Sequence, residues 1–203
     1  MNFAGNFIKL GKCDVSPLVK KVAGISNLVW EAESFRKKIY EVHKNTQTIN
    51  LLMDEDYRHK NPTRHPAFEE FEEQLKPVMG QINRYFRSSL KMQRLVKKNG
   101  PGYFIRVLFV RLLPDSNIPG HYDTYESLAR CHRIHVPLIT SDKVIFSVGG
   151  SSKHLGVGEI WEINNRHKHS VTNCSEEGRV HLILDYVQTG ESVLDVDGEK
   201  LVC

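Results

Sequence analysis

Hydrophobic and polar positions follow two different periods on either side of the Gly100-Pro101-Gly102 turn. Before this turn, apolar side chains recur at three- and four-residue steps from Pro66 to Val96, which predicts a long amphipathic helix. The stretch from Glu31 to Asn45 has similar spacing and also predicts a helix. We expect Pro77 to kink or divide the longer helix, because proline removes a backbone hydrogen bond.

The segment between these two helices has a different pattern. Thr46 to Leu52 alternates and contains residues that favour strands, so we expect a strand there. Met53 to Pro66 is polar and contains two prolines, which predicts an exposed loop. Residues 1–100 are therefore expected to be mostly helical.

After Gly102 the pattern becomes that of strands. Short apolar runs rich in β-branched and aromatic residues are separated by Gly, Pro, Asn, Asp and Ser. These runs predict strands at Tyr103–Leu113, Arg133–Ile139, Lys143–Val148, Glu159–Ile163 and Arg179–Val187. Strands without intervening helices indicate an antiparallel sandwich or barrel.

Two of these strands combine one aliphatic face with one polar face. Successive strand residues point to opposite sides, so Arg133 and His135 share a face. By the same rule Arg179, His181 and Asp185 share a face of the last strand. Arginine and histidine on one strand and arginine on another favour a pocket for an anion.

Composition narrows the classes of function. The chain has 203 residues, of which 40% are hydrophobic and 26% charged, as in one ordinary globular domain. No apolar run approaches the roughly 18 residues of a membrane span, and no secretory signal is evident, so we expect no membrane partner. Four scattered cysteines predict free thiols and a cytoplasmic location.

The net charge of +4 comes partly from Lys91, Arg94, Lys97 and Lys98. Basic residues are typical of a helix C-terminus, and no aromatic residues alternate with them as in a nucleic-acid patch. We therefore do not expect nucleic acid as a partner, although an oxygenase that modifies nucleic acids stays an alternative.

A set of metal-binding residues provides the main candidate chemistry. His121 and Asp123 lie two residues apart, and His169 lies in a distant segment that we expect to be a strand. Two histidines and one carboxylate are the ligands that hold non-haem Fe(II) while leaving other positions open. Zinc is a competing metal and His167 a competing ligand, but the chain lacks the His-Glu-x-x-His helix of zinc proteases. Arg179 follows His169 by ten residues, where a basic group could bind an acidic co-substrate.

The segment from Pro114 to Val187 resembles the aspartyl/asparaginyl β-hydroxylase family of 2-oxoglutarate-dependent oxygenases. The resemblance runs through LLPDSNIPGH, RIHVPL, GEIWEINNRHKHSV and RVHLILDYV in that order. It implies a mainly β fold with flanking helices, whose core is a double-stranded β-helix, a cupin-like jelly roll. We expect a single domain over 1–203, with this core and the metal site in 101–189 and a peripheral tail at 190–203.

The resemblance also implies roles for individual residues. His121 and His169 match the metal histidines, and Arg179 matches the arginine that binds the distal carboxylate of 2-oxoglutarate. His135 matches a histidine that assists this co-substrate. Arg133 matches an arginine near the carboxylate of the substrate or of the co-substrate, and we favour the substrate. The implied cofactors are Fe(II), 2-oxoglutarate and O2.

Asp123 separates this chain from the animal members of the family, which lack the carboxylate ligand. It resembles instead the microbial branch with a complete triad. The expected substrate is an amino acid, or an aspartyl or asparaginyl residue of a peptide or protein. Two alternatives stay open: a hydroxylase of a free amino acid such as proline, and a non-catalytic cupin-like metal-binding or sensor module.

Overall fold

Strands dominate the computed structural model, which describes residues 3–32, 43–56, 61–123, 126–194 and 200–202. The strands are β1 (Phe7–Lys12), β2 (Thr46–Met53), β3 (Thr63–Arg64), β4 (Tyr103–Leu112), β5 (Ser116–His121), β6 (His132–Ile139), β7 (Val144–Val148), β8 (Ser151–Lys153), β9 (Glu159–Ile163), β10 (His169–Asn173), β11 (Arg179–Val187), β12 (Ser192–Leu194) and β13 (Lys200–Val202). The helices are α1 (Ser16–Ala23), α2 (Asn27–Ala32), α4 (Pro66–Ser88), α5 (Leu90–Asn99) and α6 (Glu126–Ala129).

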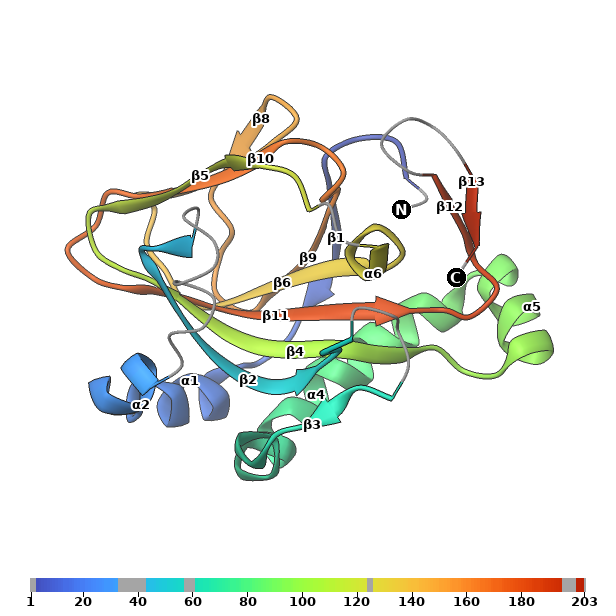
Figure 1. The fold of residues 1–203 in the computed structure, drawn as a ribbon, viewed down its shortest axis with the longest axis horizontal. Coiled ribbons are helices and arrows are strands. Elements are labelled where there is room, and N and C mark those ends of the chain that lie inside the picture. Colours follow the sequence, from blue (N-terminus) through green and yellow to red (C-terminus); the bar gives the residue numbers. More distant parts are fainter. Residues whose placement is uncertain (1–2, 33–42, 57–60, 124–125, 195–199, 203) are drawn as a thin grey trace.

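Two antiparallel sheets form the body of the molecule. The large sheet has the order β1-β9-β6-β11-β4-β2-β3, and the small sheet has the order β5-β10-β7-β8. In Figure 1 the small sheet lies above the large one, and α1, α2 and α4 lie along the far side of the large sheet. Strands β1 and β2 come from the first hundred residues, so this part of the chain helps to build the large sheet.

The predicted strands are confirmed to within one residue at each end, including the strand at Thr46. Strands β1, β3, β8, β12 and β13 were not predicted, and no bounds were predicted for β5 and β10, which carry His121 and His169. Most of the expected helix at 31–45 lies outside the described residues, since 33–42 are not described. The exposed loop expected after Met53 is wrong for Asp54, which is fully buried because it pairs with Arg106.

We expected Pro77 to kink or divide the long helix, and the division is wrong. Helix α4 continues through Pro77 to Ser88, and its buried side chains are Phe68, Phe71, Leu75, Val78, Ile82 and Phe86. Burial of this stripe offsets the one hydrogen bond that proline removes. The division comes at Ser89 instead, whose side chain accepts a hydrogen bond from the Met92 N–H and caps α5. No helix in the described ranges has the length and apolar character needed to cross a bilayer.

The two faces of the large sheet differ, as alternation along the strands predicted. Ile134, Val136, Leu182 and Leu184 join the hydrophobic core that also contains the buried side of α4. The opposite face carries Arg133, His135, Arg179, His181 and Asp185 toward the small sheet. The interior between the sheets is therefore partly polar and charged.

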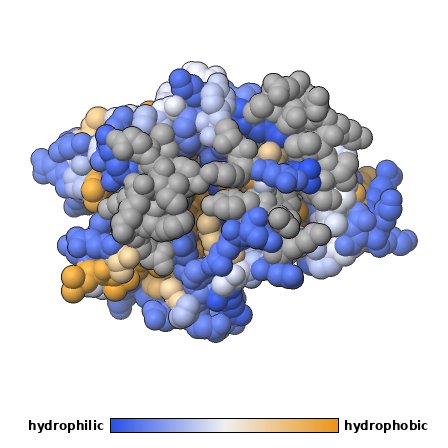
Figure 2. All heavy atoms as spheres, viewed as in Figure 1, coloured by the Kyte–Doolittle hydropathy of each residue, from blue (hydrophilic) through white to orange (hydrophobic). Residues whose placement is uncertain are grey.

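The outer surface in one view is mostly hydrophilic. Figure 2 shows an apolar patch at the lower left, at the place that α1 and α2 occupy in Figure 1. Helix α2 carries two exposed apolar side chains, Leu28 and Val29.

On the helix side of the large sheet, His132 links distant parts of the chain through buried ion pairs. Its Nδ1 lies 2.7 Å from Oε1 of Glu162, and its Nε2 lies 2.8 Å from Oε2 of Glu191. Lys91 Nζ lies 2.9 Å from the other oxygen of Glu191. Burial disfavours the imidazolium, but the two carboxylates outweigh burial and raise the pKa of His132 to about 9. The C-terminal segment is thus attached to the sheet by a histidine that is charged at neutral pH.

Replacement of His132 by Gln should flatten the dependence of stability on pH. The folded-state pKa is above the unfolded value of 6.5, so this stabilisation is complete below pH 6.5 and is lost as pH rises through about 9. We expect the difference in unfolding free energy between wild type and His132→Gln to shrink over this window by on the order of 3 kcal/mol. Urea denaturation at pH 6, 8 and 9.5 measures it, and a constant difference would contradict the ion-pair account.

Candidate active site

Strand pairing brings the three candidate metal ligands together. β5 and β10 are antiparallel neighbours, and their register places His121 opposite His169, with ring centroids 4.2 Å apart. Asp123 follows β5, and its backbone N–H donates to the Asn165 carbonyl at 3.5 Å. One ligand atom from each of His121, Asp123 and His169 lies within 4.8 Å of the other two. This spacing suits three ligands on one face of an ion.

Hydrogen bonds orient both imidazoles with Nε2 toward the cluster. His121 Nδ1 lies 2.8 Å from the Pro119 carbonyl, and His169 Nδ1 lies 3.1 Å from the His167 carbonyl. A carbonyl only accepts, so each Nδ1 carries the proton and each Nε2 keeps its lone pair. Among the described residues neither Nε2 makes a hydrogen bond, and His169 Nε2 lies 3.8 Å from Asp123 Oδ2.

The protonation states also fit metal binding. Burial disfavours the Asp123 carboxylate, but the nearby Arg133 charge and the two imidazoles outweigh burial and lower its pKa. Burial is the main reason that the pKa of His169 is lowered. An ionised carboxylate beside a neutral imidazole is the form in which both bind a cation.

Arg179 lies buried on the same inner face of the large sheet. It is 1% exposed, and its Nη2 donates to Nδ1 of His181 at 2.6 Å. His181 Nδ1 in turn lies 3.4 Å from Nδ1 of His135. In the described part of the chain no carboxylate pairs with Arg179, and its Nε is buried without a hydrogen-bond partner, as are the Nε2 atoms of both histidines. Burial lowers the pKa of Arg179 to about 9.

A buried guanidinium without a counterion is costly to a fold. Because burial also lowers the pKa of His135 and of His181 far below the ordinary range, both imidazoles are neutral. The charges of Arg179 and Arg133 also lower the pKa of His135. Arg179, His135 and His181 therefore offer an anion one positive charge and three nitrogen atoms that have no hydrogen-bond partner in the described chain.

Arg133 forms the other side of the site. Its Nη1 donates to Asp123 Oδ2 at 2.8 Å, and its Nε and Nη2 donate to the two oxygens of Asp185 at 2.9 and 2.8 Å. A guanidinium has five N–H groups, so two are left after these three bonds. Arg133 is nearly buried, with 11% of its side chain exposed.

Some residues of this site escaped the sequence analysis. Strand alternation placed His181 and Asp185 on the same face as Arg179, but we assigned these two residues no role. Arg106 and Asp54, which extend the ion pairs of Asp185, carried no local signal. His167 is exposed and bonds Asn6, and the metal cluster contains His169 rather than His167. His132 lies on the opposite face of β6 from Arg133, toward the helices.

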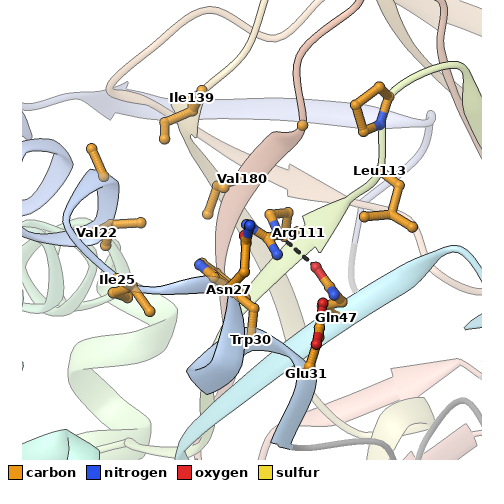
Figure 3. A pocket seen from close by; sticks show the side chains of 13 residues that line it. Val22, Ile25, Asn27, Trp30, Glu31, Gln47, Arg111, Leu113, Ile139 and Val180 are labelled. Carbon is orange, nitrogen blue, oxygen red and sulfur yellow. Dashed lines mark hydrogen bonds between the residues drawn. The ribbon is translucent and has the colours of Figure 1, made fainter.

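A separate cavity of about 650 Å³ lies on the helix side of the large sheet (Figure 3). Arg111 lies over the Trp30 ring at 4.7 Å, and donates to Gln47 Oε1 at 2.6 Å and to Asn27 Oδ1 at 3.0 Å. None of the residues that line it belongs to the metal cluster. We therefore assign this cavity to the packing of α1 and α2 on the sheet, not to the reaction.

The family model described as aspartyl/asparaginyl beta-hydroxylase matches residues 88–189, half of the chain. The chain belongs to this family. It is therefore an enzyme, an Fe(II)- and 2-oxoglutarate-dependent dioxygenase that uses O2. No curated protein has a sequence that matches significantly.

Solved structures with low sequence identity share the fold. An oxidoreductase of the 2OG-Fe(II) oxygenase family from Burkholderia pseudomallei has a TM-score of 0.53 and 14% identity, covering 87% of this chain and 91% of that one. A Pseudomonas putida prolyl-4-hydroxylase has a TM-score of 0.50 and 13% identity, covering 91% and 94%. The viral collagen prolyl hydroxylase from Paramecium Bursaria Chlorella virus-1, in complex with 2OG, has a TM-score of 0.50 and 9% identity, covering 90% and 96%. The predicted jelly-roll core with flanking helices is confirmed.

Proposed function

We propose that this dioxygenase hydroxylates an amino acid, either free or as an aspartyl or asparaginyl residue of a peptide. One observation carries the proposal: among the described residues Arg179 is a buried cation with no carboxylate partner, and it lies on the sheet face that also holds Arg133 beside Asp123. Such an arginine is suited to a carboxylate, which it can bind through two parallel hydrogen bonds.

The metal site is built for a divalent ion. In the proposal His121 and His169 bind Fe(II) through Nε2 and Asp123 binds it through a carboxylate oxygen. Backbone carbonyls fix both rings, so little rotamer entropy is lost when the ion binds. When bound, Fe(II) with 2-oxoglutarate and O2 supplies the oxidation of a C–H bond, with succinate and CO2 as co-products.

The co-substrate contacts are proposed at the other end of the polar face. Arg179 receives the distal carboxylate of 2-oxoglutarate, and His181 holds the guanidinium in place through its Nδ1. His135 keeps a buried Nε2 without a partner in the described chain, and we propose that this atom assists the co-substrate. The low pKa of His135 keeps this ring neutral, so it acts as a dipole and not as a second cation.

Arg133 is the proposed contact for the substrate. Its two remaining N–H groups could receive a carboxylate of the substrate without loss of the bonds to Asp123 and Asp185. The family takes amino-acid or peptide substrates, and two of the solved structures that share the fold are prolyl hydroxylases. Both facts support a substrate of the amino-acid class.

Replacement of His169 by Ala should abolish stable Fe(II) binding and, with it, turnover, because a facial site with two remaining ligands holds the ion weakly. His167→Ala is the matched control, since His167 lies two residues away, is exposed and is outside the cluster. Anaerobic Fe(II) titration by calorimetry measures both variants. Loss of binding in His167→Ala with retention in His169→Ala would reverse the ligand assignment.

Replacement of Arg179 by Ala should weaken 2-oxoglutarate binding and leave Fe(II) binding near the wild-type level. Loss of a charge-assisted contact costs about 3 kcal/mol, which is roughly a hundredfold in the dissociation constant. The matched control is Arg111→Ala, because Arg111 lies on the helix side of the same sheet and stacks on Trp30. Equal affinities for 2-oxoglutarate in wild type and Arg179→Ala would remove Arg179 from the site.

Succinate release from the Fe(II)-loaded enzyme in air tests the substrate class. We expect stimulation by a member of an amino-acid pool or by peptides that contain aspartate or asparagine. Stimulation by a free amino acid selects the free-substrate alternative, and stimulation by peptides alone selects the residue-level alternative. No succinate from protein that has bound both Fe(II) and 2-oxoglutarate would contradict the proposal and favour the non-catalytic metal module.

A further inference from the structure

Asp185, Arg106 and Asp54 form a buried ionic chain that ends at Arg133. We propose that this chain positions Asp123 for the metal by controlling how Arg133 approaches the carboxylate. The inference rests on the proposed role of Asp123 as a ligand. Asp185, Arg106 and Asp54 would be positioning residues, since none of them belongs to the metal cluster.

Strand register sets the first part of the chain. Asp185 on β11 is the cross-strand partner of Arg133 on β6 and of Arg106 on β4. Directly opposite side chains lie on the same face of a sheet and close enough to form an ion pair. Three neighbouring strands therefore place one carboxylate between two guanidinium groups.

The contacts follow this register. Arg133 makes a two-bond fork with Asp185, and Arg106 Nη1 donates to Asp185 Oδ2 at 3.1 Å. Arg106 Nη2 then donates to Asp54 Oδ2 at 3.1 Å. Asp54 and Asp185 are fully buried, and Arg106 is 2% exposed. Because no member of this part of the chain can turn toward water, the plane of the Arg133 guanidinium is fixed.

The fixed guanidinium plane determines which oxygen of Asp123 is contacted by Arg133. Arg133 reaches Asp123 with one nitrogen, Nη1, and contacts only Oδ2. Among the described residues Oδ1 of Asp123 accepts no hydrogen bond, so its lone pairs are left for an ion. Asp185 also shares the positive charge of Arg133, which limits how strongly Arg133 competes with a metal for Asp123.

Loss of the Asp185 charge should weaken metal binding for two reasons that act in the same direction. The site loses a nearby negative charge that favours a cation. Arg133, released from its fork, would bind Asp123 more completely and compete with the metal for the same carboxylate. Outer groups of this kind typically contribute about 10- to 100-fold to metal affinity.

Calorimetric titration of the metal-free protein with Co(II) tests the inference, because it reads metal affinity without turnover. We expect Asp185→Asn to raise the Co(II) dissociation constant by about 10- to 100-fold and Asp54→Asn to raise it by less. The matched control is Glu191→Gln, which removes a buried carboxylate from the His132 ion pairs on the opposite side of the sheet. Its Co(II) affinity should equal that of wild type even where its melting temperature falls.

The outcomes separate this inference from the proposed function. A folded Asp185→Asn protein with wild-type Co(II) affinity would overturn the positioning role. If Asp185→Asn does not fold, Asp54→Asn decides: weaker Co(II) binding at a preserved melting temperature supports the role, and unchanged binding overturns it. A wild-type protein that binds no Co(II) would instead refute the metal site itself.

Discussion

Charges buried between the two sheets have to balance, because an unpaired ion in a protein interior costs several kcal/mol. Arg106, Arg133 and Arg179 meet there with Asp54, Asp123 and Asp185. The three positive and three negative charges cancel in total, but they are not paired one to one. Arg179 has no carboxylate partner in the described chain, and Asp123 and Asp185 share Arg133. In the proposed function, a divalent metal at Asp123 and a dianionic 2-oxoglutarate at Arg179 bring equal and opposite charges. These six charges would therefore sum to zero with neither ligand or with both, and they would leave a net charge when only one is bound.

The same arrangement depends on strand register. β6, β11 and β4 align Arg133, Asp185 and Arg106 in one row, and β5 and β10 align His121 with His169. A slip of one residue in any of these pairs would turn the functional side chains to the opposite face of the sheet. The hydrophobic face packed against α4 opposes such a slip, because the slip would place Ile134, Leu182 and Leu184 in the polar interior. Core packing thus maintains the geometry of the site from the other side of the sheet.

The sequence predicted those residues of the candidate site whose position follows from strand alternation or from motif spacing. Alternation along the strands placed Arg133 and His135 on one face, and spacing identified His121, Asp123 and His169. It could not find Asp54 or Glu191, whose partners lie 52 and 59 positions away in the chain. Nothing in a polar loop or a tail indicates burial when the neutralising charge comes from a distant strand. The helix is not divided at Pro77 for a related reason, since a buried stripe along α4 outweighs a local helix-breaking preference.

Two neighbouring residues of β6, His132 and Arg133, belong to separate ion networks. His132 points toward the helices and pairs with Glu162 and Glu191, whereas Arg133 points between the sheets and pairs with Asp123 and Asp185. Both are buried ion networks of similar size, yet only the second touches the metal cluster. A substitution in the first network should therefore leave metal affinity unchanged even where it lowers the melting temperature, whereas one in the second network should lower metal affinity. Because the two networks share one strand, a disturbance of β6 itself would affect both, so side-chain substitutions that leave the backbone pairing intact distinguish them.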